Sequence, residues 1–149
     1  MALLPDGSKQ YKSKTAAVRR AGRYGQGWLP YIVSVEQVRT TVRQLGEYAR
    51  EAGRNPDGII VGLNNSWLVK DTYEEALKGA RLGGVRYGRD LSERVSQVDL
   101  LGTPEDIIRR MNEYIDAGVT HFSCNWMGDP GEVQQQMEIV AKKVMPYFR

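Results

Sequence analysis

Residues 102–122 read GTPEDIIRRMNEYIDAGVTHF, and this stretch decides the fold class of the chain. Thr103 can cap a helix by accepting a hydrogen bond from a backbone N–H, and Pro104 fits the first helical turn because no donor is needed there. Apolar residues then recur at three- and four-residue spacing, which predicts a helix with one buried face that ends at Gly118. The apolar run that follows at once is typical of a covered parallel strand. The stretch therefore predicts the second half of a βαβ unit.

The rest of the chain repeats this alternation of helix and strand. Ser34 and Gln37 match a capping box ahead of an apolar helix face that ends at Gly53. Helices are predicted at about 13–24, 35–52, 72–82, 104–117 and 132–144, and strands at 28–33, 59–63 and 119–124. Residues 85–101 have a mixed pattern and are interpreted as a loop with one helical turn. The count is three parallel strands, each paired with a helix.

Length and composition indicate one folded domain. The chain has 149 residues, of which 41% are hydrophobic and 26% charged, and this composition excludes a disordered segment. We expect a single α/β domain over residues 13–149, preceded by a loose segment at 1–12. No apolar run is long enough to span a membrane, and the first residues lack the basic region of a signal peptide. These features predict a cytoplasmic protein with no membrane partner.

The titratable residues of the sequence form no recognisable reactive cluster. Cys124 is the single cysteine, so it cannot form an internal disulfide, and with the single His121 it makes no metal-ligand set. We expect both to be core residues of the third strand, and no metal site. Asp99, Glu105 and Asp106 are interpreted as turn and capping carboxylates rather than as an acid–base pair.

The net charge of +3 is unevenly distributed along the chain. Residues 1–30 carry six lysines and arginines against one aspartate, a net +5, which leaves −2 for residues 31–149. A basic start could meet the phosphate of a cofactor or of a nucleic acid. A solvated helix face is the better interpretation, because the aromatic residues that single-strand binding needs do not alternate with these charges. We expect no nucleic-acid partner.

Three segments, in the right order, resemble the luciferase-like monooxygenase family of flavin- or deazaflavin-dependent (β/α)8 enzymes. Residues 17–30 are similar to the family's helix-then-strand before the sixth strand, 51–57 to its next helix end, and 102–122 to its last barrel unit. The resemblance covers roughly residues 15–149, all of it the C-terminal part of the family. Gln26 stands where the family usually has an acidic residue, so no role of that carboxylate is carried over.

A closed barrel of this kind needs about 250 residues, so this chain cannot close one alone. Three parallel strands leave two sheet edges and the barrel-lining face without partners. We therefore expect a partial TIM-barrel-like α/β fold of about three parallel βα units that is completed by self-association, because a copy of the chain supplies edges and face by symmetry. A complementing chain, or the N-terminal segment laid across the open face, are the alternatives.

The carboxyl ends of the strands are where a ligand is expected in such a fold. The segments there combine aromatic and amide side chains, which suit a flat isoalloxazine ring, and the start of the first helix is a candidate site for the cofactor phosphate. Helix–strand packing of the tryptophans and turn chemistry of the asparagines are the structural alternatives. The predicted cofactor-binding residues are Trp28, Asn64, Asn65, Ser66, Asn125 and Trp126 for the ring, and Ser13, Lys14 and Thr15 for the phosphate.

The resemblance implies a flavin- or deazaflavin-dependent oxidoreductase or monooxygenase that uses FMN or a deazaflavin on a small-molecule substrate. No residue of the sequence is identified as catalytic. The alternative is a non-catalytic truncated remnant that acts as a small-ligand-binding or protein-interaction module. The fold does not decide between these, because one scaffold supports many functions.

Overall fold

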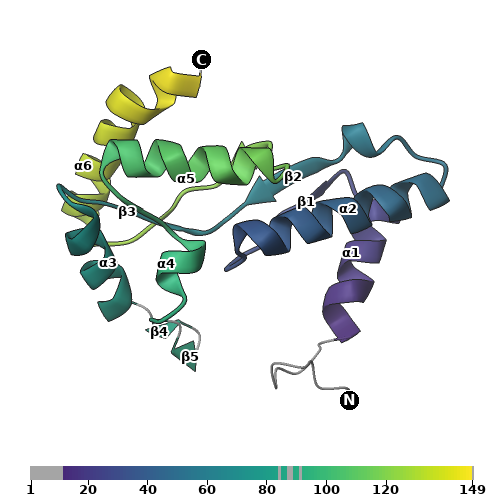
Figure 1. The fold of residues 1–149 in the computed structure, drawn as a ribbon, viewed down its shortest axis with the longest axis horizontal. Helices are drawn as coiled ribbons and strands as arrows, with labels where there is room; N and C mark the ends of the chain where they lie inside the picture. The colour runs from purple at the N-terminus through teal and green to yellow at the C-terminus, as the bar shows by residue number, and fades with distance from the viewer. Residues whose placement is uncertain (1–11, 84, 87–88, 91, 149) are drawn as a thin grey trace.

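The computed structural model describes residues 12–83, 85–86, 89–90 and 92–148. The elements follow in the order α1 (Lys12–Tyr24), β1 (Gly27–Trp28), α2 (Val35–Glu51), η1 (Pro56–Gly58), β2 (Ile60–Leu63), β3 (Ser66–Val69), α3 (Tyr73–Leu82), β4 (Val85–Arg86), β5 (Arg89–Asp90), α4 (Val95–Val98), β6 (Leu100–Gly102), α5 (Pro104–Asp116), β7 (His121–Phe122), β8 (Asn125–Trp126), α6 (Pro130–Ile139), η2 (Val140–Val144) and η3 (Met145–Phe148). Helices α1 and α2 lie with β1 at one end of the molecule, and α3, α4 and α6 lie at the other (Figure 1).

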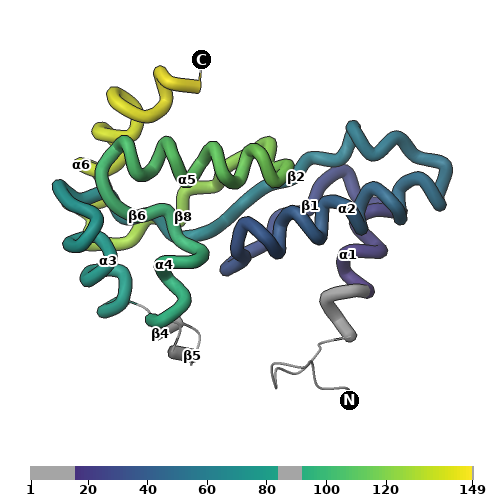
Figure 2. Tube along the Cα trace, in the orientation of Figure 1, coloured from purple at the N-terminus to yellow at the C-terminus, as the bar shows by residue number. Residues whose placement is uncertain are grey.

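Two three-stranded parallel sheets form the centre of the fold. Their strand orders are β1-β2-β7 and β6-β3-β8, and the short β4 and β5 pair separately in antiparallel fashion. β2 leads into β3, and β7 leads into β8, each after two residues, so the same two chain segments supply the middle and one side of both sheets. The continuous path of β2 and β3 across the molecule is visible in the chain trace (Figure 2). The fold is therefore the expected α/β class with only part of a barrel present.

The hydrophobic core consists of two clusters on opposite faces of β3. The larger cluster joins alternate residues of β2 and β3, among them Leu63 and Trp67, to helices α2, α5 and the end of the chain. The smaller cluster packs Leu68 and Leu101 against α3 and α4. Because side chains of a strand alternate between faces, β3 is covered on both sides and is fully buried. In the first sheet, by contrast, β1 and β7 each carry one exposed and one half-buried residue.

The helix predictions are confirmed closely. Ser34 and Gln37 form the capping box of α2, Thr72 caps α3, and Thr103 forms a capping box with Asp106 at the start of α5. The last predicted helix is also present, although it begins at Pro130 behind an Asp129 capping box and changes to a π-helical turn at Val140. These matches follow from local signals, since caps and apolar spacing need no information from the rest of the chain.

The strand predictions need three corrections. The first strand ends at Trp28 rather than Val33, because Pro30 cannot donate a ladder hydrogen bond. Residues 66–69, where no strand was predicted, form the buried strand β3. Residues 85–101 were predicted as a loop with one helical turn; that turn is present as α4, but residues 100–102 form the buried strand β6. In the last two cases the partners are distant in sequence, so no local pattern marks the strands.

Candidate functional site

The sheet β1-β2-β7 has one face that no described segment covers, and we call it the open face. Gly62 in β2 pairs with His121 in β7, and the side chain of Leu29 lies across Gly62. Leu29 is 63% exposed and Ile60 48% exposed, although both are large apolar residues. Alternation along the strands places Trp28, Val61, Leu63 and Phe122 on the other face, which packs against the helices. The open face corresponds to the lining of the missing barrel.

Two sequence expectations about the open face are wrong. His121 and Cys124 were expected in the core, and both are exposed. The physical reason is that the layer of side chains that lines a closed barrel is missing over β7. The His121 ring nitrogen Nδ1 lies 3.0 Å from the Thr120 hydroxyl, so the ring has a fixed neighbour and an exposed far side. His121 therefore presents an exposed imidazole on this face, where sequence reasoning expected a core residue.

Cys124 is also exposed, but the pKa of its thiol does not favour reactivity. Desolvation of its sulfur raises the pKa of the thiol above its usual value, even though the residue as a whole is exposed. A raised pKa leaves less thiolate at neutral pH, and thiolate is the nucleophilic form. The geometry does not make Cys124 a nucleophile.

Asn65 is one of the predicted ring-binding residues, and its amide is already used inside the protein. Its Oδ1 accepts a hydrogen bond from the Val33 N–H at 3.2 Å. Its Nδ2 donates to the Val33 carbonyl at 2.8 Å, to the Val98 carbonyl, and to the Tyr114 hydroxyl oxygen at 2.9 Å. The residue is 0% exposed. The structure thus gives Asn65 a structural role that ties the loop after β1 to α4 and α5.

Ser66 and Asn125, both predicted to bind the ring, lie side by side as the first residues of the neighbouring strands β3 and β8. They are register partners of β3 and β8, and the Asn125 Nδ2 donates to the Ser66 hydroxyl at 3.3 Å. The Ser66 N–H donates to Asp99 Oδ1 at 3.0 Å. Asp99 was expected to be a turn or capping carboxylate; it directly follows α4, is 1% exposed and acts as a buried hydrogen-bond acceptor. Of this group only Asn125 is half-exposed and open to a ligand.

The remaining ring-binding predictions fall in different places. Trp126 packs on the buried Trp67 with ring centroids 5.6 Å apart, on the helix side of the sheet. Trp28 also lies on the helix side, where it borders a cavity between α1 and α2. Asn64 is half-exposed at the bend between β2 and β3, and its backbone N–H donates to the Pro30 carbonyl at 3.0 Å. The predicted residues therefore do not form one continuous surface.

The predicted phosphate site lies mostly outside the described residues. Helix α1 begins at Lys12, so Ser13, Lys14 and Thr15 belong to its first turn, and Ser13 is not the residue before the helix. Their side chains are outside the part of the chain that the structure describes. The phosphate site stays a prediction.

A polar cavity of about 400 Å³ lies where β3 and β6 end and α3, α5 and α6 begin. On one wall the Lys70 ammonium pairs with the Glu132 carboxylate at 2.8 Å, and this hydrogen bond lowers the pKa of Glu132. Gln136 is 3% exposed, accepts the Val69 N–H at 2.8 Å and donates to the Met127 carbonyl at 2.7 Å. Sequence reasoning missed this group, although Lys70 directly follows a buried strand. The described polar contacts of Lys70, Glu132 and Gln136 are to other protein groups, so these residues join α6 to β3.

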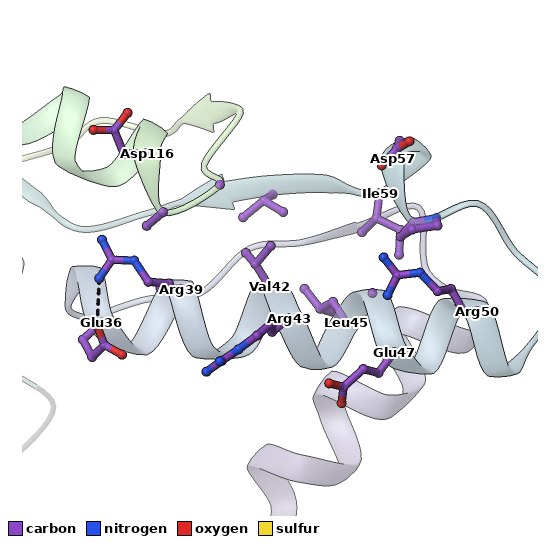
Figure 3. Close-up of a pocket in the computed structure, with 15 residues that line it drawn as sticks. Glu36, Arg39, Val42, Arg43, Leu45, Glu47, Arg50, Asp57, Ile59 and Asp116 are labelled. Atoms are coloured by element: carbon purple, nitrogen blue, oxygen red, sulfur yellow. Dashed lines mark hydrogen bonds and ion pairs between the residues drawn. The ribbon is translucent and has the colours of Figure 1, made fainter.

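A second groove, of about 670 Å³, runs between α2 and the segment that joins α5 to β7. Its floor contains Val42 and Ile59, and Arg39 and Arg50 project from α2 toward β2, with Asp116 on the opposite wall (Figure 3). Arg39 already pairs with Glu36 at 2.8 Å. Because Ile59 precedes β2, this groove lies at the amino ends of the strands. In barrel enzymes that end serves stability rather than chemistry.

Among the described residues, no group of three or more histidines, cysteines and carboxylates could hold a metal ion. In the same residues no helix has the length and apolar character needed to cross a bilayer.

The parallel strands, the helices that cover one face, and the open lining face define part of a TIM-barrel-type α/β protein. The model of the luciferase-like monooxygenase family matches residues 13–92, and the chain belongs to this family. A search of curated proteins found no match.

Solved structures agree in fold. An F420-dependent secondary alcohol dehydrogenase, in complex with an F420-acetone adduct, is 20% identical with a TM-score of 0.76, over 91% of this chain and 46% of that one. The coenzyme F420-dependent tetrahydromethanopterin reductase of Methanopyrus kandleri is 17% identical with a TM-score of 0.71, over 91% and 49%. The oxygenating constituent of 3,6-diketocamphane monooxygenase from Pseudomonas putida, a type II Baeyer–Villiger enzyme in complex with FMN, is 21% identical with a TM-score of 0.67, over 87% and 45%. This chain thus spans about half the length of the structures it matches.

Proposed function

We propose that this chain contributes one part of a flavin- or deazaflavin-dependent oxidoreductase, with the cofactor ring lying against the open face. The observation that carries the proposal is that face itself, which presents apolar and polar groups side by side. Leu29 and Ile60 supply apolar area, with the Leu29 side chain lying over Gly62, and the exposed His121 supplies a polar edge. The half-exposed Asn125 lies in β8, the strand that follows β7. A flat heterocycle with one polar edge needs this combination. Enzymes of the same fold that use F420 and FMN support it.

The open face is one wall of such a site, and the described residues do not supply a second wall opposite it. We propose that copies of this chain pair through the free edges of β1 and β7, so that the site is assembled between them; a complementing chain is the alternative. Unpaired strand edges carry free N–H and C=O groups, and pairing them with a partner strand satisfies those groups. In the matched structures the same fold is part of a chain about twice as long, so a second chain would supply what the described residues lack.

FMN or a deazaflavin would supply electron or hydride transfer to a small-molecule substrate. The residues of this chain would bind and orient the cofactor. The Asn125 amide can hydrogen-bond the polar edge of the ring, Leu29 and Ile60 can exclude water from one face, and the exposed His121 can take up or release a proton at the ring or the substrate.

The second candidate is a non-catalytic remnant that binds a small ligand or another protein. The specific observation in its favour is that Asn65 and Ser66, which were predicted to bind the ring, are buried and bonded to protein groups. A site that has lost those contacts binds a ring more weakly, because fewer polar groups fix its orientation.

Flavin binding distinguishes the two candidates. Purified protein is titrated with FMN, and separately with F420, while absorbance is followed on a size-exclusion column with light scattering. The oxidoreductase proposal expects cofactor absorbance in a multimer peak, and a loss of affinity of about tenfold in Asn125→Ala. Asn112→Ala, a change on α5 away from the open face, is the matched control and keeps wild-type affinity. A multimer that binds neither cofactor supports the remnant.

A further inference from the structure

A separate cavity of about 430 Å³ lies between α1, the end of β1 and the first half of α2. It does not belong to the open face, because Trp28, which borders it, packs on the helix side of the sheet. Its volume is within the range of small-molecule pockets. Its lining residues are Ala17, Val18, Trp28, Pro30, Tyr31, Val33, Glu36, Gln37, Thr40 and Thr41.

The lining divides into an apolar wall and a polar edge. Val18 and Pro30 are buried, Trp28 and Val33 are half-buried, and together they give a surface suited to the face of an aromatic ring. On α2 the Gln37 Oε1 accepts the Ser34 N–H at 2.9 Å, and its Nε2 pairs with no described residue. This amide and the Thr41 hydroxyl form the polar edge. A molecule with a flat apolar body and one hydrogen-bonding group fits both parts.

The loop that forms the apolar wall is held in a strained conformation. Ile32 has a φ of 55°, and a β-branched side chain strongly disfavours this left-handed region. The next residue is clamped on both backbone groups, since Asn65 binds the Val33 N–H and its carbonyl, and the Tyr114 hydroxyl donates to the same carbonyl at 2.8 Å. Strained backbone persists only where its surroundings hold it, and a wall fixed in advance loses less entropy when a ligand binds.

We propose that this cavity binds an uncharged, flat aromatic molecule of about two fused rings with one hydroxyl or carbonyl group. The ring lies against Trp28 and the clamped loop, and the polar group faces Gln37 and Thr41. Among the described lining residues Glu36 is the only charged one, and it is already paired with Arg39 at 2.8 Å, so the lining offers no uncompensated charge and the ligand class is neutral. This site uses one chain only and does not depend on the proposed flavin site.

The probe is 2-naphthol, which is neutral at pH 7, titrated into ¹⁵N-labelled protein and followed by NMR. The proposal expects saturable shifts of the amide signals of residues 28–41. Ala17 lines the cavity and is itself exposed, so Ala17→Phe sets a ring at the mouth of the cavity and weakens binding at least about tenfold. Ala16→Phe is the matched control, because Ala16 is exposed on the same helix and does not line the cavity, and it keeps wild-type affinity.

A second variant tests the polar edge without filling the cavity. Thr41→Val removes only the hydroxyl and weakens 2-naphthol about threefold to tenfold. FMN binding, if present, stays unchanged in all three variants, since the open face lies elsewhere. The proposal is overturned if wild-type protein shows no saturable shifts, or if Ala17→Phe and Ala16→Phe bind the probe equally.

Discussion

At the scale of single residues, Asn65 connects more separate parts of the molecule than its position between two strands suggests. Its amide joins the loop after β1 to α4 and to α5 through four hydrogen bonds. Burial raises the pKa of its partner Tyr114 well above the usual range, so the Tyr114 hydroxyl keeps its proton and can donate. Removing one partner from such a network leaves buried polar groups unpaired, which costs more than the bond contributes.

Replacing Asn65 by alanine is expected to lower the free energy of unfolding by about 2–4 kcal/mol, because buried groups of Val33 and Val98 lose their partner. Asn64→Ala is the control at the neighbouring position, where the side chain makes no hydrogen bond to the described residues, and its expected effect is below about 0.5 kcal/mol. Urea unfolding followed by circular dichroism measures both. Equal losses in the two variants would show that the amide network does not stabilise the loop.

At the scale of elements, the start of α5 is the best-defined local structure of the chain. Gly102 has a φ of 114°, and a Cβ atom there would lie 2.5 Å from the Asp106 carboxylate, so only glycine lets that side chain reach back. Burial opposes ionisation of Asp106, but hydrogen bonds from the Thr103 N–H, from Arg109 and from the Thr103 hydroxyl outweigh it. The pKa of Asp106 is therefore lowered.

Because the pKa of Asp106 is lowered in the folded state, its carboxylate stabilises the fold at every pH above the pKa of an unfolded aspartate, near about 4. This stabilisation is lost as the pH falls through the pKa that Asp106 has in the folded protein. Asp106→Asn is expected to reduce stability by about 1 kcal/mol at pH 7, with the difference from wild type shrinking below pH 4. Glu105→Gln is the control, because Glu105 is an exposed carboxylate in the same turn. Urea midpoints between pH 7 and pH 2.5 test this, and a constant difference would contradict it.

At the scale of the whole molecule, the two sheets differ in how they are covered. β3 has helices on both faces, whereas the sheet β1-β2-β7 has them on one face only and leaves Leu29 and Ile60 exposed. Large exposed apolar residues beside unpaired strand edges are a typical signature of an interaction surface. The proposed self-association uses this surface.

Ile60→Lys is expected to convert the proposed multimer to monomer, because a charged side chain would be buried against the partner. The same change leaves the stability of the monomer within about 0.5 kcal/mol, since Ile60 is exposed there. Leu82→Lys alters another apolar residue, 80% exposed on α3, and keeps the wild-type mass. Light scattering on a size-exclusion column measures the mass. Wild-type protein that elutes as a monomer would refute self-association.

The sequence by itself determined the helices and the class of the fold. Caps at Ser34, Thr72 and Thr103 and the apolar spacing behind them act within one turn, so they can be read without the rest of the chain. Of the three segments that resemble the family, 17–30 and 51–57 lie inside the family match over 13–92, and 102–122 lies beyond it. The neighbourhood of Ser66 and Asn125 could not be read from local signals, because it arises from the pairing of β3 with β8.

The tertiary structure alone decided which residues are free to act. Asn64 and Asn65 are identical in type and adjacent, yet one is half-exposed and the other is fully bonded, because the bend between β2 and β3 turns them to different sides. His121 was expected in the core and is exposed, since the layer that would cover it is missing. Strands β3 and β6 were not predicted, because a buried strand is defined by the strands that pair with it and the helices that cover it. These come from residues far along the chain.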